Sequence, residues 1–215
     1  MNRHFDAVLF DFGGVFTPSP FLAIEAAGTE LGARPGQLLE IIFGSYHEDN
    51  DHPWHRLERG EIDLGSAREE IMAIAVHEGF DVDPLQLLLR SSSSGGGGVR
   101  EAVVERTRRL RDDGYRTALV TNNAREFRAG WSSLLATDEL FDAVIDSSEV
   151  GMRKPDPRIY TYSLAQIGGV VPERAIFLDD FEGNIDAAVK LGMTGILVGP
   201  DPQPALAVLD EALSS

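Results

Sequence analysis

The segment AVLFDFGGV, residues 7–15, opens with four apolar residues and runs directly into Asp11, Phe12 and a pair of glycines. Short apolar runs without alternating polar residues are typical of strands that are buried on both faces of a parallel sheet. Four later runs have the same character, at residues 117–120, 143–145, 175–178 and 195–198. We therefore expect a parallel sheet whose first strand ends at Asp11.

Helical patterns separate the later runs. The stretch 100–113 stops at Gly114 and the stretch 185–191 stops at Gly192, and glycine commonly follows the last turn of a helix. Another helix is expected to start at Asp156-Pro157, because Asp is a good N-cap and Pro fits the first helical position. Strands that alternate with helices predict a doubly wound, Rossmann-like α/β core over residues 1–20 and 91–215.

A long section, residues 21–90, separates the first strand from the others and reads as helices without strands. Ser66 and Glu69 have the spacing of a capping box, and Asp83-Pro84 is a second helix start signal. An all-helical insert after the first strand is placed to cover the ends of the strands. We predict a helical cap over residues 21–90.

Four serines and four glycines follow one another at residues 91–98. Such a run lacks the side chains that pack a core, and its composition is typical of a flexible linker. Three interpretations remain open: a hinge of a moving cap, a disordered surface loop, or an artefact.

Composition restricts the classes of function. The chain has 215 residues, a net charge of −16 and no cysteine. The negative charge disfavours nucleic acids and anionic membranes as partners, and the lack of cysteine excludes disulfides and thiol catalysis. No signal peptide is recognised, and no apolar run reaches the roughly 20 residues that span a bilayer. We expect a cytoplasmic protein, either a monomer or a homodimer.

Polar residues follow four of the predicted strands: Asp11, the triplet Thr121-Asn122-Asn123, the loop 151–155 with its Lys154, and Asp179-Asp180. In an open α/β sheet, ligands bind in the crevice beyond the carboxyl ends of the strands. The sequence thus predicts that carboxylates, a hydroxyl and a cation meet in one place.

The order of these segments resembles the four motifs of the haloacid dehalogenase-like hydrolases. FLDDFEGN at residues 177–184 is an especially close match to the fourth motif, and the similarity extends from Ala7 to about Val198. FDFGGV at residues 10–15 also resembles phosphatase-like domains fused to epoxide hydrolases or acyl-CoA dehydrogenases, and some bacterial sugar-phosphate phosphatases. The resemblance implies a helical-cap hydrolase that acts on a small phosphorylated metabolite.

Roles carried over from the family begin with Asp11, which would attack phosphorus and form an aspartyl-phosphate. The pattern implies Mg²⁺ bound by Asp11, Asp180 and the backbone carbonyl of Gly13, since Mg²⁺ prefers oxygen ligands. Thr121 and the backbone amide of Asn122 would hold the phosphoryl oxygens.

The loop of residues 13–14 also belongs to the implied phosphate site, through Gly13 and Gly14. Lys154 would neutralise charge on the nucleophile and on the transferring group. Asp179 and Asn184 would orient the lysine or the metal-bound water rather than touch the substrate.

One position departs from the family pattern. Most phosphatases of the superfamily carry a second aspartate two residues after the nucleophile, where this chain has Gly13. That aspartate protonates the leaving alkoxide, and general acid–base help is worth roughly 10²–10⁴ in rate. Three outcomes are open: a group of the predicted cap supplies the proton, the leaving group needs none, or the protein binds phosphorylated ligands without useful turnover. Within the polar stretch 46–55 of the cap, Trp54 or His55 is the expected contact with the substrate.

Three functions remain to be weighed. A Mg²⁺-dependent phosphatase agrees best with the motifs. A 2-haloacid dehalogenase would need neither metal nor leaving-group proton, so Gly13 would be harmless, yet such enzymes do not usually carry the Asp179-Asp180 pair. The third is a catalytically weak, phosphate-binding regulatory domain.

Overall fold

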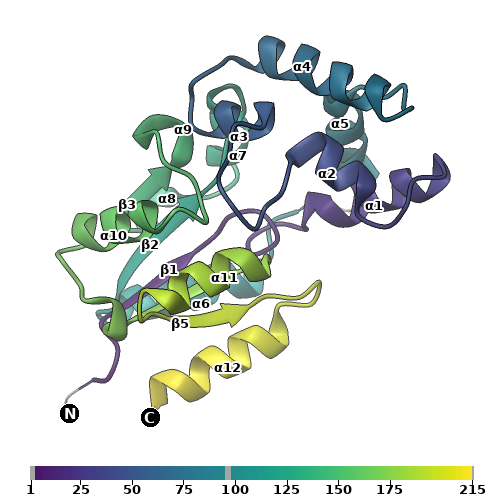
Figure 1. Cartoon of the computed structure of the whole chain (residues 1–215). Coiled ribbons are helices and arrows are strands. Elements are labelled where there is room, and N and C mark those ends of the chain that lie inside the picture. The colour runs from purple at the N-terminus through teal and green to yellow at the C-terminus, as the bar shows by residue number, and fades with distance from the viewer. Residues whose placement is uncertain (1–2, 95–97, 215) are drawn as a thin grey trace.

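The computed structural model describes residues 3–94 and 98–214, with the backbone alone for residues 90–94 (Figure 1). Its centre is a five-stranded sheet in the order β3-β2-β1-β4-β5, and every neighbouring pair is parallel. The strands are β1 (Ala7–Phe10), β2 (Arg116–Thr121), β3 (Ala143–Asp146), β4 (Ala175–Asp179) and β5 (Thr194–Leu197). The predicted doubly wound α/β sheet is thereby confirmed.

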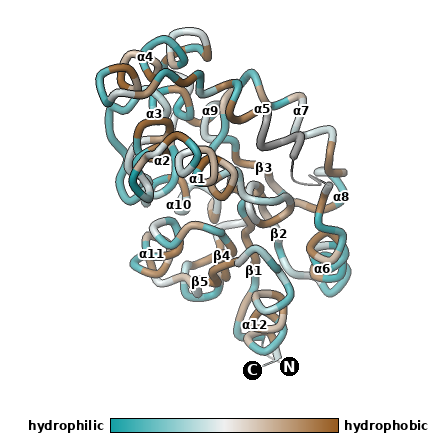
Figure 2. Tube along the Cα trace, turned by 90° about the vertical axis from the view of Figure 1, so that its right-hand side faces the viewer, coloured by the Kyte–Doolittle hydropathy of each residue, from teal (hydrophilic) through white to brown (hydrophobic). Residues whose placement is uncertain are grey.

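The central strand β1 is buried on both faces, which explains its uninterrupted apolar sequence. Val8 and Phe10 belong to one hydrophobic cluster, whereas Ala7 and Leu9 belong to another. Helices α6 (Glu101–Asp112) and α12 (Gln203–Ser214) cover the first face, and α10 (Pro157–Gln166) and α11 (Glu182–Lys190) cover the second. Figure 2 shows hydrophobic residues along the central strands and hydrophilic ones on the outer turns of the helices.

Local signals place the ends of these helices. Gly114 has a φ of 81° and Gly192 a φ of 101°, so both adopt the left-handed conformation expected after a last turn. The Asp156 side chain accepts a hydrogen bond from the backbone N–H of Arg158, as an N-cap does.

Among the described residues between β1 and α6 there are five helices, and we call residues 20–94 the helical insert. Its members are α1 (Pro20–Glu30), α2 (Gln37–Phe43), α3 (Pro53–Glu58), α4 (Leu64–His77) and α5 (Pro84–Ser94). They pack on one another around their own hydrophobic cluster, and in Figure 1 they lie over one edge of the sheet. Residues 21–90, predicted to be helical, are helical with short connections.

The predicted capping box at Ser66 and Glu69 is wrong. The helix α4 already begins at Leu64, because Asp63 is its N-cap and accepts a hydrogen bond from the backbone N–H of Ser66 at 2.8 Å. An aspartate three residues earlier therefore supplies the acceptor that the sequence assigned to the serine.

The four serines of the run 91–98 have a helical backbone and do not form a linker. Residues 91–94 are the last turn of α5, so α5 continues past the predicted boundary between residues 90 and 91. The three glycines 95–97 lie outside the described residues. The three interpretations of this part of the run, a hinge, a surface loop or an artefact, therefore stay predictions.

Short helices complete the connections between strands: η1 (Arg125–Phe127), α7 (Arg128–Ser132), α8 (Thr137–Leu140), α9 (Ser147–Val150) and η2 (Pro172–Arg174). Among the described residues, no helix has both the length and the apolar character needed to cross a bilayer.

Candidate active site

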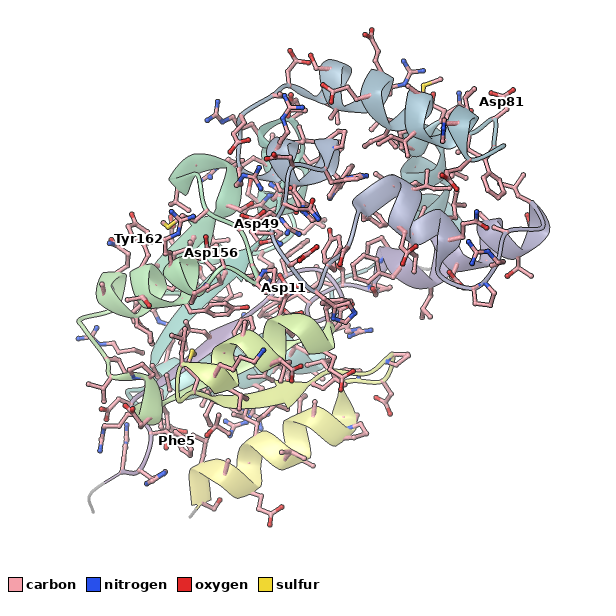
Figure 3. The ribbon with its side chains drawn as sticks, viewed as in Figure 1. Phe5, Asp11, Asp49, Asp81, Asp156 and Tyr162 are labelled. Carbon is pink, nitrogen blue, oxygen red and sulfur yellow. The ribbon has the colours of Figure 1, made fainter. Side chains whose placement is uncertain are left out.

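The polar residues that follow β1, β2 and β4 line one pocket of about 620 Å³. Asp11 lies at its floor, and Figure 3 places this residue between the sheet and the helical insert. Most of the residues predicted from the sequence line the pocket together: Asp11, Gly13, Trp54, Thr121, Asn122, Lys154, Asp180 and Asn184.

Lys154 is the central cation of the site. Its Nζ lies 2.7 Å from Asp11 Oδ1 and 2.8 Å from Asp179 Oδ2. The lysine is 1% exposed. Burial lowers the pKa of Lys154, but the charges of Asp11 and Asp179 outweigh burial and leave that pKa above its ordinary value. The ammonium group therefore stays protonated beside Asp11.

Asp179 is fully occupied by protein donors. Its Oδ1 accepts hydrogen bonds from the Phe181 backbone N–H at 2.8 Å and from Asn184 Nδ2 at 3.1 Å. Its Oδ2 accepts from Lys154 Nζ at 2.8 Å and from the same amide group at 3.0 Å. A carboxylate held in this way orients the lysine and has little capacity left for a ligand.

Three carboxylates lie close enough to share a metal ion. Asp11, Asp179 and Asp180 each offer an oxygen, and the three oxygens lie within 4.8 Å of one another. Burial, together with the negative charge of Asp179, raises the pKa of Asp11 well above its usual range and that of Asp180 to about 7. The single positive charge of Lys154 does not balance the negative charges of three ionised carboxylates. Because protein donors already occupy Asp179, Asp11 and Asp180 are the two carboxylates that suit a hard divalent cation such as Mg²⁺.

The two glycines of the loop after Asp11 differ in their surroundings. A Cβ built on Gly13 meets no atom within 4 Å. A Cβ on Gly14, which has a φ of 74°, would lie 2.0 Å from Asp180 Cγ. Gly14 is therefore the residue that lets the loop after β1 approach the Asp180 carboxylate.

The side chain of Asn122 holds the backbone of Lys154 in the loop 151–155. Its Nδ2 donates to the Lys154 carbonyl at 2.9 Å, and its Oδ1 accepts from the Lys154 N–H at 2.8 Å. Thr121, at the end of β2, is 4% exposed and lines the pocket. Asn123 instead bonds Ser147 and Asp146 around β3. The resemblance had implied only a backbone role for Asn122, and this side-chain contact was not foreseen.

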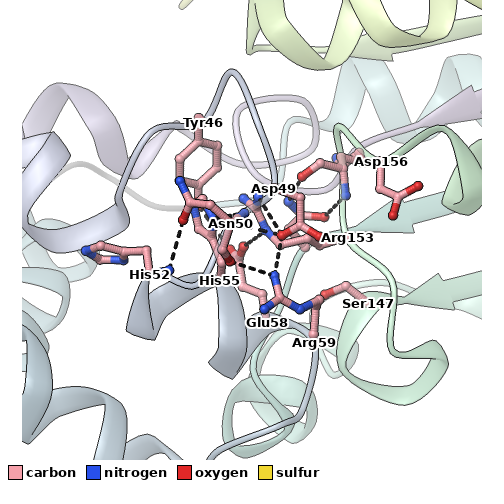
Figure 4. A network of polar contacts seen from close by, with 12 residues as sticks. Tyr46, Asp49, Asn50, His52, His55, Glu58, Arg59, Ser147, Arg153 and Asp156 are labelled. Carbon is pink, nitrogen blue, oxygen red and sulfur yellow. Dashed lines mark hydrogen bonds and ion pairs between the residues drawn. The ribbon is translucent and has the colours of Figure 1, made fainter.

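A buried polar network joins the helical insert to the core beside the pocket (Figure 4). Glu58 of α3 accepts hydrogen bonds from Trp54 Nε1 at 2.8 Å, Tyr46 Oη at 3.0 Å and Arg153 Nε at 2.7 Å. Glu58 is 2% exposed and Arg153 is fully buried, with its guanidinium 5.1 Å from the centre of the Tyr46 ring. The residue next to Lys154 thus ties the core to the insert.

The structure does not bring His55 to the pocket. This histidine is fully buried within the insert, and its Nδ1 accepts a hydrogen bond from the Asn50 N–H at 3.2 Å. Burial lowers the pKa of His55 to about 3 and that of His52 to about 4. Neutral, enclosed imidazoles of this kind are not proton donors to a ligand near pH 7. Trp54 does line the pocket, and its indole N–H is held by Glu58.

The fold and this cluster agree with one family of known proteins. A family model described as a haloacid dehalogenase-like hydrolase matches residues 5–192. The chain belongs to the haloacid dehalogenase-like hydrolases. The resemblance stated from the sequence is thereby confirmed.

Relatives of this hydrolase include both long and short proteins. Acyl-CoA dehydrogenase family member 10 of Mus musculus is 29% identical over 99% of the chain, which spans only about a fifth (19%) of that protein. A sesquiterpene phosphatase of Aspergillus oryzae is 28% identical, and the match covers 91% of both chains. A haloacid dehalogenase-family enzyme of Bacteroides thetaiotaomicron, solved with magnesium and inorganic phosphate, shares the fold at a TM-score of 0.60 and 19% identity, covering 91% of this chain and 95% of that one.

Several pocket residues escaped the sequence reasoning. Leu85, Leu88 and Leu89 of α5 line the pocket from the insert, and Trp131 lines it from the core. The three leucines have the spacing i, i+3, i+4 of one helix face, which predicts an apolar stripe but does not indicate what the stripe contacts. The sequence reasoning assigned no role to Arg153.

We predict that Gly14→Ala weakens Mg²⁺ binding at least about tenfold, because the added methyl displaces the Asp180 carboxylate and the left-handed backbone disfavours alanine. Calorimetric titration of Mg²⁺ measures the effect. Gly13→Ala is the matched control, since its methyl enters open space and should leave the affinity within about twofold. Equal losses in the two variants would contradict the assignment.

We also predict that Glu58→Gln or Arg153→Met lowers the free energy of unfolding by about 3–5 kcal/mol. Arg153→Met leaves the buried Glu58 carboxylate without a cation, and Glu58→Gln leaves the buried Arg153 only its 3.6 Å ion pair to Asp49. The double variant should lose less than the sum of the two. Urea denaturation measures these changes. Arg109→Met removes an exposed ion pair to Glu105 and should lose no more than about 0.5 kcal/mol. Additive or negligible effects at Glu58 and Arg153 would show that the pair does not act as a unit.

Proposed function

We propose that the protein is a Mg²⁺-dependent phosphatase of small phosphate monoesters, with Asp11 as the nucleophile. The observation that carries the proposal is the position of Lys154 Nζ, 2.7 Å from Asp11 Oδ1 at the floor of a pocket that Asp180 also lines. A carboxylate poised beside a buried ammonium group, among further carboxylates, suits attack on a phosphoryl group. The sesquiterpene phosphatase among the relatives supports the same class of reaction.

Asp11, Lys154 and Thr121 have different roles in the proposed reaction. An oxygen of Asp11 forms a bond to phosphorus while the ester P–O bond breaks, and the released oxygen takes a proton from water to leave as the alcohol. A second water molecule then attacks phosphorus, which releases inorganic phosphate and restores the Asp11 carboxylate. Lys154 holds Oδ1 of Asp11 and offsets negative charge on the phosphoryl oxygens. Thr121, a buried hydroxyl of the pocket, is placed to donate to one of those oxygens.

A bound Mg²⁺ would neutralise the repulsion between Asp11 and the incoming phosphate and polarise its oxygens. Asp11 and Asp180 would hold the ion, together with the carbonyl of Gly13. Asp179 and Asn184 would act through Lys154, whose ammonium group they orient.

The acidic pair also distinguishes the phosphatase from a 2-haloacid dehalogenase. Halide displacement needs no metal, so a dehalogenase does not require a second carboxylate beside the nucleophile to hold a cation. Here the Asp180 carboxylate lies within 4.8 Å of the nucleophile's oxygen, and burial raises its pKa to about 7. A site with this excess of negative charge favours metal-assisted phosphoryl transfer.

We expect the purified protein to hydrolyse p-nitrophenyl phosphate only with Mg²⁺, and Asp11→Asn to lower kcat at least about 10³-fold because the nucleophile is lost. Release of p-nitrophenol, followed with and without a chelator, measures both effects. The far-UV circular dichroism of Asp11→Asn should match that of the unchanged chain. Chelator-resistant turnover, or halide release from 2-chloropropionate, would contradict the proposal.

Gly13→Asp tests the missing acid. The position has open space for a side chain, so an aspartate there should supply the leaving-group proton and raise kcat by about 10²-fold on an alkyl phosphate. An aryl phosphate is the control substrate, because its leaving group is more acidic and should respond less. Equal or no gains on the two substrates would show that another group already protonates the leaving oxygen.

A further inference from the structure

The wall of the pocket is markedly apolar beyond its catalytic floor. Aromatic rings surround it from both layers of the molecule: Phe21, Phe43, Tyr46 and Trp54 come from the helical insert, and Phe12, Phe127, Trp131 and Phe181 come from the core. Several of these rings contact one another, as Phe12 and Trp131 do at 5.3 Å between centroids. Such a wall binds hydrocarbon and offers few hydrogen bonds to a polyhydroxylated ligand.

Two leucines of the wall are exposed to solvent. Leu89 of the insert is 69% exposed and Leu134 of the core is 48% exposed, and both line this pocket. Single exposed leucines are common on protein surfaces, but here they lie in the same concave site as the aromatic rings. An apolar ligand that reached from Asp11 towards these leucines would remove them from water.

The charges of the pocket argue against a second anionic group on the ligand. Among the described residues that line it, Lys154 is the only cation, and it already contacts two carboxylates. The anions beyond the floor are Glu58 and Glu126. A carboxylate or second phosphate far from Asp11 would meet these anions and no free cation.

We propose that the pocket takes the phosphate monoester of an uncharged, apolar alcohol, with the phosphate at Asp11 and Lys154 and the hydrocarbon along the aromatic wall. This substrate class rests on the proposed phosphatase function. The pocket volume of about 620 Å³ lies within the usual range of small-molecule sites, so a chain or ring system of moderate size is enclosed.

A homologous series of n-alkylphosphonates, from ethyl to octyl, tests the ligand class by calorimetric titration with Mg²⁺ present. These phosphonates are not hydrolysed, so binding is measured apart from turnover. Each methylene that enters the pocket should tighten Kd by up to about fourfold, and octyl should bind at least about 100-fold more tightly than ethyl. A terminal carboxylate on the octyl chain should weaken binding at least about tenfold.

Leu89→Ser and Leu134→Ser should each reduce octylphosphonate affinity by about tenfold and leave ethylphosphonate affinity unchanged. Leu22→Ser is the matched control, since Leu22 is 62% exposed on α1 and does not line the pocket. It should change neither affinity. Equal effects of all three substitutions would contradict the placement of the hydrocarbon.

The outcomes separate the two proposals. A series that varies less than about threefold, or a nucleoside monophosphate that binds more tightly than octylphosphonate, overturns the apolar ligand class even if p-nitrophenyl phosphate is hydrolysed. Chain-length-dependent binding without turnover of any ester supports the ligand class and overturns the proposed phosphatase function.

Discussion

The buried contact between Lys154 and two carboxylates is the constraint on which the site depends. An ammonium group that is 1% exposed is tolerated only because Asp11 and Asp179 lie within 2.8 Å of it. The backbone of Lys154 is held by the side-chain amide of Asn122, which forms hydrogen bonds with both the N–H and the carbonyl of Lys154. Three different strand ends therefore fix one cation, and the parallel sheet is what brings those strand ends together.

Much of this arrangement could be predicted from the sequence, because it follows from the order of strands and from short-range signals. Apolar runs without alternation identified the strands, and an aspartate directly after a run, as at Asp11, marked a strand end. The polar segments after the strands belong to one edge of the sheet by topology alone. Their convergence around Lys154 required no knowledge of side-chain packing.

The contacts between insert and core could not be predicted in the same way. His55 and Glu58 lie three residues apart on α3, yet one is enclosed within the insert and the other meets Arg153, 95 positions away. Nothing in the local pattern says which polar residue of a short helix finds a buried partner in another layer. The predicted cap at Ser66 was wrong for a simpler reason, since Asp63 and Ser66 are both suitable acceptors near the same helix end and Asp63 is the one that caps α4.

The adjacency of Arg153 and Lys154 has a mechanical consequence. One side chain of this dipeptide is anchored to the insert through Glu58, and the next is anchored to Asp11, the proposed nucleophile. If the insert moves away from the sheet, either the ion pair between Arg153 and Glu58 breaks or the peptide that joins Arg153 to Lys154 moves with the insert. Entry of a ligand below the insert and the position of the Asp11 carboxylate are therefore coupled through a single peptide bond.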